Sequence, residues 1–195
     1  MKVASLIVVV AAVAAGCANT NSGAGSGAAS QATGSPSSST SSSTAVASPV
    51  PSLDLSAVKV PTACTGSNGQ PMSKAQAATC WAAMWQGLQY QDLPALMSAH
   101  SDLATVRRAA QIELNGDMIV VKTLRTAPWP ASVASQCRLL ADDQAQRVPP
   151  LQSLAHASTQ QEAEQAYARY LDVSGTSMQV SEATNEIVAR LGITP

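Results

Sequence analysis

The pattern of hydrophobic positions divides the chain into three parts. Residues 3–15 form an apolar run with one polar residue, Ser5, and in residues 18–52 Ser, Gly, Ala, Thr and Pro fill nearly every position. Residues 53–195 instead place apolar side chains at every third or fourth position, which is typical of amphipathic helices that bury one face. The pattern therefore predicts one folded helical domain over residues 53–195, preceded by two segments of a different kind.

The periodicity within the folded part predicts an all-α fold, an antiparallel bundle of four to five helices. Two capping boxes, Ser73 with Gln76 and Thr159 with Glu162, favour helix starts, because each side chain can bind the other residue's backbone N–H. The predicted helices cover residues 74–90, 92–114, 130–148, 151–173 (with an interruption near 158–159) and 181–191.

Breaking residues predict where these helices end. Asn115-Gly116 favours a helix end, since both residues tolerate a left-handed conformation, and Pro149-Pro150 favours another, since proline lacks the N–H that a helix needs. Gly192 stands where the last helix needs a left-handed cap, with Ile193 able to fold back on Val188.

Residues 117–126 are ambiguous, because their apolar run fits either a buried strand or a short helix capped by Asp117. No second convincing strand exists to pair with it, and a lone strand leaves its backbone groups unsatisfied. We therefore predict a helix here.

The amino terminus combines Lys2, the apolar run and the small residues Ala14-Ala15-Gly16 directly before Cys17. The run is too short to span a bilayer but has the length of a secretory signal core. This pattern resembles the lipobox of bacterial lipoproteins, although that family most often has Leu where this chain has Ala14. The resemblance implies that residues 1–16 are a signal peptide, that Cys17 carries lipid, and that the protein is anchored to the extracytoplasmic face of the cell membrane. An ordinary signal peptide with an incidental cysteine is the alternative.

Residues 17–52 are predicted to be a disordered tether. No charged residue and few large apolar side chains occur between residues 18 and 52, so ordering the segment would cost entropy without compensating burial. A flexible chain of this length spans on the order of 30–35 Å. Its Ser/Thr-rich composition leaves O-glycosylation open.

The charge balance excludes one class of function. The formal net charge is −1, with 12% charged residues, so there is no basic surplus to track a phosphate backbone and no nucleic-acid partner is expected.

Three cysteines remain after Cys17, namely Cys64, Cys80 and Cys137, and an odd number in an oxidising compartment leaves one free. Pairing Cys64 with Cys80 would fasten the Pro/Gly-rich lead-in to the first helix. Pairing Cys64 with Cys137 would do so through a longer loop, and three reduced buried thiols remain a further alternative.

Candidate chemistry is sparse. The sequence holds no nucleophile elbow, Walker loop or zinc-protease motif, and no cofactor, metal or catalytic residue is predicted. His100 with Asp102 does not make a zinc site, and His156 stands alone. Arg107-Arg108 and Asp142-Asp143 are expected on solvated faces. The aromatic residues could line a ligand pocket between helices, although at helical spacing they fit a core equally well: Trp81, Trp85, Tyr167 and Tyr170.

Several features together are similar to small actinobacterial lipoproteins of uncharacterised function. They are the lipobox, the tether, Trp81 and Trp85, Pro128-Trp129-Pro130-Ala131, and the ending Leu191-Gly192-Ile193-Thr194-Pro195. The resemblance implies a helical extracytoplasmic domain on a lipid anchor. We expect a non-enzymatic module that binds an envelope protein or a small molecule. The alternatives are a carrier of a small apolar ligand or haem between helices and, third, an envelope hydrolase.

Overall fold

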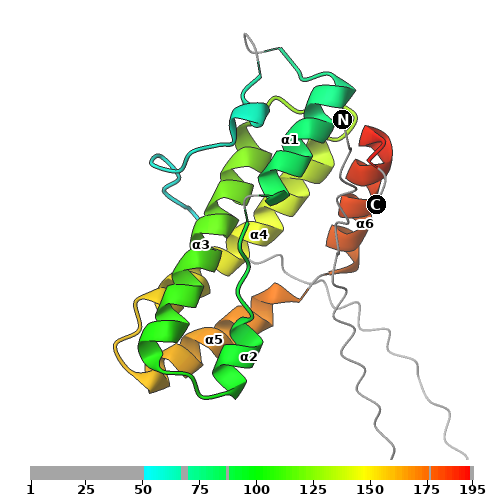
Figure 1. Cartoon of the computed structure of the whole chain (residues 1–195). Helices are drawn as coiled ribbons and strands as arrows, with labels where there is room; N and C mark the ends of the chain where they lie inside the picture. The colour runs from blue at the N-terminus through cyan, green and yellow to red at the C-terminus, as the bar shows by residue number, and fades with distance from the viewer. Residues whose placement is uncertain (1–50, 67–69, 87, 176, 194–195) are drawn as a thin grey trace, which may run out of the picture. The chain divides into compact units, whose positions relative to one another are not determined.

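Two long helices run the length of the folded part, and four shorter helices pack beside them (Figure 1). The structure, a computed structural model, describes residues 51–66, 70–86, 88–175 and 177–193. The long helices are α3 (Leu103–Thr126) and α4 (Ala134–Ala155). The four shorter helices are α1 (Lys74–Gln86), α2 (Leu93–Ser98), α5 (Gln160–Ser174) and α6 (Met178–Leu191). A single 3-10 turn, η1 (Thr62–Cys64), precedes them.

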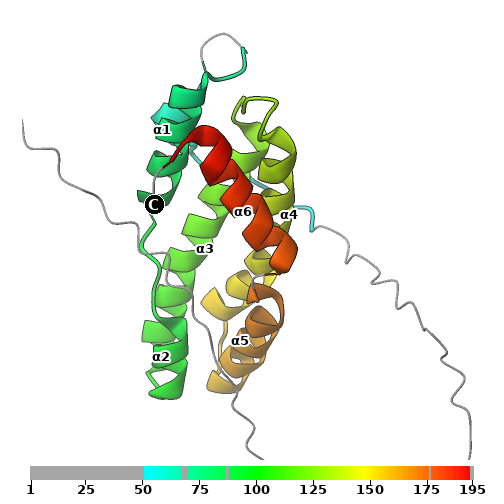
Figure 2. The same ribbon diagram turned by 90° about the vertical axis from the view of Figure 1, so that its right-hand side faces the viewer.

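The all-α prediction is confirmed, with six α-helices and no strand among these described residues. The two long helices contact each other extensively, α1 and α2 follow one another beside α3, and α5 and α6 follow one another along α4. In both views α1 and α6 lie at one end of the bundle and α2 and α5 at the other (Figures 1 and 2). The result is an antiparallel bundle in which two of the four helical columns are broken.

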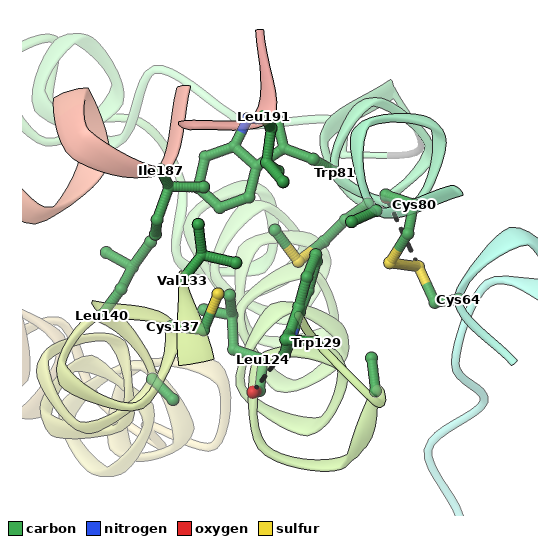
Figure 3. Close-up of a cluster of buried hydrophobic side chains, with 14 of the residues drawn as sticks. Cys64, Cys80, Trp81, Leu124, Trp129, Val133, Cys137, Leu140, Ile187 and Leu191 are labelled. Carbon is green, nitrogen blue, oxygen red and sulfur yellow. Dashed lines mark hydrogen bonds between the residues drawn. A yellow bond between two sulfur atoms is a disulfide. The ribbon is translucent and has the colours of Figure 1, made fainter. Parts of the chain in front are cut away.

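The hydrophobic core is accordingly divided into two clusters. The first, called here the α1–α6 core, lies between α1, α6 and the adjoining halves of α3 and α4 (Figure 3). The second, called the α2–α5 core, lies between α2, α5 and the opposite halves of the long helices. Large fully buried members are Met84, Leu124, Val133 and Ile187 in the first, and Leu93, Val106, Leu151 and Leu154 in the second.

The helix starts largely follow the predicted capping residues. Ser73 and Gln76 bind each other's backbone N–H groups at the start of α1, and Thr159 Oγ1 accepts from the backbone N–H of Glu162 at the start of α5. Asp92 caps α2 as predicted. At the end of α6, Gly192 has a φ of 67°, and the N–H of Ile193 binds the carbonyl of Val188. Local sequence alone therefore fixes these boundaries.

The predicted helix over residues 92–114 is wrong in two ways. The chain breaks after Ser98, where His100 adopts a φ of 50°, and Asp102 caps a new helix through the backbone N–H of Thr105. That helix then passes through Asn115-Gly116 without ending, so residues 117–126 are helical but belong to α3.

Gly116 serves close packing rather than a helix end. It is buried in the middle of α3, and a Cβ built on it would lie 3.1 Å from Leu88 Cδ2. Leu88 belongs to the connector between α1 and α2, which we define as residues 88–91. The missing side chain therefore lets this connector cross α3 at short range.

The helix end predicted at Pro149-Pro150 is also wrong, since α4 continues to Ala155 with both prolines inside. A proline within a helix costs about 3 kcal/mol or more. Beyond the prolines, however, Leu151 and Leu154 are fully buried in the α2–α5 core, and each such burial contributes roughly 1.5–3 kcal/mol. Packing thus outweighs the local preference, and residues 151–155 extend α4 instead of opening the next helix.

Candidate functional site

A layer of polar side chains, most of them ionisable, separates the two hydrophobic cores. We define this charged layer as Glu113 and Asp117 on α3, Gln144 and Arg147 on α4, and Tyr170 on α5. All of them are buried except Arg147, which keeps 15% of its side chain exposed. On both long helices the layer falls where membership changes from the α2–α5 core to the α1–α6 core.

Arg147 is the centre of the layer. Its Nη2 lies 2.7 Å from Glu113 Oε1 and 2.6 Å from Tyr170 Oη, and its Nη1 lies 3.3 Å from Gln144 Oε1. The guanidinium also stands 5.3 Å from the ring centroid of Tyr170, while the Tyr170 hydroxyl donates to Glu113 Oε1. One cation therefore joins α3, α4 and α5 through charge-assisted hydrogen bonds.

The charges in the layer do not balance, because two carboxylates share one guanidinium. Arg147 Nε lies 3.3 Å from Asp117 Oδ2, which is ion-pair distance, but the pair lacks hydrogen-bond geometry. Within the part of the chain that the structure describes, both carboxylate oxygens of Asp117 and Oε2 of Glu113 lack a hydrogen-bond partner. Buried polar atoms without partners are costly, so the layer carries unsatisfied polar groups at its least accessible point.

Burial, which Arg147 partly offsets and the negative charge of Glu113 reinforces, raises the pKa of Asp117 from its ordinary 3.8 to about 7. The surrounding groups follow the same logic. Burial raises the pKa of Tyr170, as does the Glu113 carboxylate, and the pKa of Arg147 is raised by the carboxylates despite its burial. The layer thus contains one carboxyl group that can exchange its proton near neutral pH.

Tyr90, in the connector of residues 88–91, borders the layer from outside. Although 45% of Tyr90 is exposed, burial of its remainder raises the pKa of its hydroxyl, and the charge of Asp117 raises it further. Glu113 is only 4% exposed and Asp117 fully buried, so neither carboxylate is open to a substrate. The arrangement can hold or release a proton, but it does not present a reactive group at a surface.

The sequence analysis missed this layer because it assigned Asp117 to a helix cap. The available signal was that Glu113 and Asp117 lie four residues apart and continue the apolar stripe of Val106, Ala110 and Leu114. Acidic residues on a buried face require a partner, and Arg147 on the next helix supplies it.

The four aromatic residues proposed to line a pocket do not come together. Trp81 and Trp85 pack edge to face, with ring centroids 5.6 Å apart. Trp81 and Trp129 belong to the α1–α6 core (Figure 3), and Trp85 packs partly buried against it. Tyr167 and Tyr170 stack with centroids 6.1 Å apart in the α2–α5 core. The residues are therefore packing elements of two separate cores and do not line a shared cavity.

Neither histidine lies in the charged layer. His100 and His156 are exposed, and each ring Nδ1 lies near a backbone carbonyl of its own segment. His156 borders a shallow open depression of about 230 Å³ together with Ser153, Ala157, Glu162, Gln165 and Arg169. Within the described ranges, no group of three or more His, Cys, Asp or Glu side chains is placed to hold a metal ion.

Of the two charged pairs expected on solvated faces, Arg107-Arg108 and Asp142-Asp143, the second is only partly exposed. Arg107 and Arg108 are exposed, although Arg107 Nε donates to the carbonyl of Ala155 at the end of α4. Asp142 is exposed and pairs with Arg125, whereas Asp143 is half-buried, and burial raises its pKa. The Asp142-Asp143 pair thus straddles the edge of the bundle.

The cysteines adopt one of the predicted pairings. Cys64 and Cys80 form a disulfide with Cα atoms 4.6 Å apart, which joins η1 to α1 (Figure 3). Cys137 is a free thiol in the α1–α6 core, and burial raises its pKa to about 12. A thiol in this state is unreactive. Cys17, the predicted signal peptide and all of the predicted tether except residues 51–52 lie outside the described residues.

Comparisons with known proteins give no relative to guide the assignment: no family model, curated protein or solved structure matches the chain. A search of the described helices for a candidate membrane span finds none that combines the length and the apolar character required.

Replacing the central cation should destabilise the domain strongly. Arg147→Met leaves two buried carboxylates uncompensated, so we expect the free energy of unfolding to fall by about 3–5 kcal/mol in urea denaturation. Adding Glu113→Gln and Asp117→Asn to this variant should recover most of the loss. Arg125→Met, which removes an exposed pair with Asp142, is the matched control and should cost less than about 1 kcal/mol. Equal losses in the two single variants would contradict the central role of Arg147.

Proposed function

We propose that this protein is a lipid-anchored extracytoplasmic module, held at the cell membrane through Cys17, whose helical domain binds a partner and catalyses no reaction. The tether of residues 17–52 spaces the domain from the membrane surface. The partner is an envelope protein or a small molecule that reaches the outer face of the membrane.

The Cys64–Cys80 disulfide is the observation that carries this proposal. Disulfides persist in oxidising compartments and are rare where thiols are kept reduced. The N-terminal sequence favours export on separate grounds, since its apolar run ends in small residues directly before Cys17. Two unrelated features, one in the folded domain and one in the N-terminal sequence, thus support the same location.

The way in which the chain enters the domain also supports an N-terminal anchor. The ammonium group of Lys122 on α3 donates to the backbone carbonyls of Leu55, Ser56 and Val58, at 2.8, 3.3 and 2.6 Å. Leu53 packs against the α2–α5 core and Val60 against the α1–α6 core. The lead-in, residues 53–61, is therefore bound along α3 before the chain reaches the disulfide. This attachment suits a domain that is held to the membrane through its N-terminal end.

A binding role fits the exposed apolar side chains better than a catalytic role fits the charged layer. Leu171 and Met178 are 51% and 78% exposed and lie on either side of the break between α5 and α6. Met is among the residue types enriched at protein–protein interfaces. The carrier alternative gains no support, because Trp81 and Tyr170 are packed into different cores.

Removing the lipidated thiol tests the anchor. We expect Cys17→Ala to leave the membrane fraction, or to remain uncleaved, because the acyl chains that hold the protein are absent. Cell fractionation and intact-protein mass spectrometry measure both outcomes. Cys137→Ala, which removes a buried free thiol, is the matched control and should stay in the membrane fraction. Normal membrane retention of a processed Cys17→Ala protein would overturn the proposed anchor.

Photo-crosslinking tests the proposed contact surface. A photo-reactive amino acid at Met178 should give a discrete adduct in intact cells, whereas the same group at exposed Glu182, one turn along α6, should give much less. The double variant Leu171→Ser and Met178→Ser should lose the adduct when the probe is placed at neighbouring Gln179. Equal labelling at residues 178 and 182 would argue against a contact at this break.

A further inference from the structure

We propose that the charged layer is a proton-operated joint between the two halves of the bundle. When Asp117 loses its proton, the halves loosen at the layer and the connector of residues 88–91 moves off α3. This proposal concerns the folded domain and does not depend on the lipid anchor or on any partner.

The first support is the position of the helix breaks. The column formed by α1 and α2 is interrupted beside Gly116 and Asp117, where Leu88 and Tyr90 approach α3. The column formed by α5 and α6 is interrupted shortly after Tyr170, which contacts Arg147. Of the described elements only α3 and α4 therefore continue through the layer, and the buried residues fall into two separate apolar clusters on either side of it. A relative movement of the two halves at the layer would therefore disturb few buried apolar contacts among the described residues.

The second support is the set of groups that surrounds Asp117. Its own helix contributes Glu113, and α4 contributes Arg147, with Asp143 farther along the same helix near Arg147. The connector contributes Tyr90, and α5 contributes Tyr170. Arg147 is the only cation among these groups, and its hydrogen bonds go to Glu113, Gln144 and Tyr170. A charged Asp117 is therefore left without a hydrogen bond in a buried site, which favours opening.

The third support is the connector that covers this side of α3. Its contact with the helix rests on Leu88 over Gly116, where no side chain intervenes. Tyr90 is half-exposed and faces the negative charge of the layer. The connector is a short non-helical segment next to the group that changes charge, held through Leu88, which also packs partly buried against the α1–α6 core, so we expect it to move first.

The direction of the pH effect follows from the raised pKa of Asp117. Its ordinary value is 3.8 and its folded value about 7, so the folded state binds the proton more tightly than an opened state does. The closed state is favoured below pH 3.8, and the advantage is lost as the pH rises through 7. The pKa values of Asp54, Asp102 and Glu162 are lowered in the folded state. Their contribution to the stability of the fold is therefore lost only toward acid, below their ordinary pKa values of 3.8 to 4.5. A comparison of pH 5.5 with pH 8 separates the two effects.

Hydrogen–deuterium exchange of the folded domain tests the proposal directly. After correction for intrinsic exchange rates, we expect the opening equilibrium in peptides covering residues 88–91 to rise by on the order of tenfold to thirtyfold between pH 5.5 and pH 8. Peptides from the centres of the two cores should change less. A rise that is uniform along α3 and α4 would show global unfolding instead and would overturn the joint.

The decisive variant is Asp117→Asn, which mimics the protonated carboxyl group and cannot ionise. It should keep the connector closed at both pH values. Glu182→Gln on the exposed face of α6, and the double variant His100→Asn with His156→Gln, are controls that should retain the wild-type pH response. If Asp117→Asn keeps the same response, or the wild type shows none, the proposal is wrong.

Two further variants guard against a folding failure. Asp117→Leu removes the charge with an apolar side chain of similar size and should likewise abolish the pH response. Gly116→Val places methyl groups where Leu88 now lies, so it should open the connector at both pH values without any change in Asp117. A closed connector in Gly116→Val would contradict the contact on which the joint depends.

Discussion

A single guanidinium, that of Arg147, holds the middle of this bundle together. It binds Glu113, Gln144 and Tyr170 and faces Asp117, so it connects α3, α4 and α5 at the one level where the hydrophobic core is interrupted. Burying such a group costs solvation that its partners only partly return, so the layer is not an economical source of stability. We expect the layer to favour one register of the two long helices, because sliding one helix along the other would separate Arg147 from Glu113 and Asp117.

The division into two cores follows from this layer. Apolar packing is non-directional and would also allow continuous outer helices. In this bundle both outer columns are broken, one between α1 and α2 and the other between α5 and α6 (Figures 1 and 2). The two ends differ in their covalent support. The α1–α6 core is fastened by the Cys64–Cys80 disulfide, and Lys122 holds the lead-in along α3, while no disulfide joins the described residues of the α2–α5 core.

The sequence predicted the features that depend on near neighbours in the chain. Ser73, Thr159 and Gly192 act as helix boundaries because each interacts within three or four residues of itself. Gly116 and Pro149 do not end their helices, although their local preference favours a helix end. The contacts that outweigh this preference are long-range: Leu88 packs over Gly116, and the leucines that follow Pro149 pack into the α2–α5 core. The sequence pattern does not reveal the charged layer, because only the fold brings Arg147 close to Asp117. The cysteine pairing stayed open on the same ground.

The most direct test of this account is the titration of Asp117 itself. Carbon-13 NMR of the side-chain carboxyl, assigned by comparison with Asp117→Asn, reports the protonation of that one group in the wild-type domain. The account predicts a midpoint near the value of about 7 set by its burial, with the amide signals of Tyr90 and Arg147 changing over the same pH range. A midpoint at or below the ordinary 3.8 would mean that Asp117 is a stably paired carboxylate, and the joint would not exist.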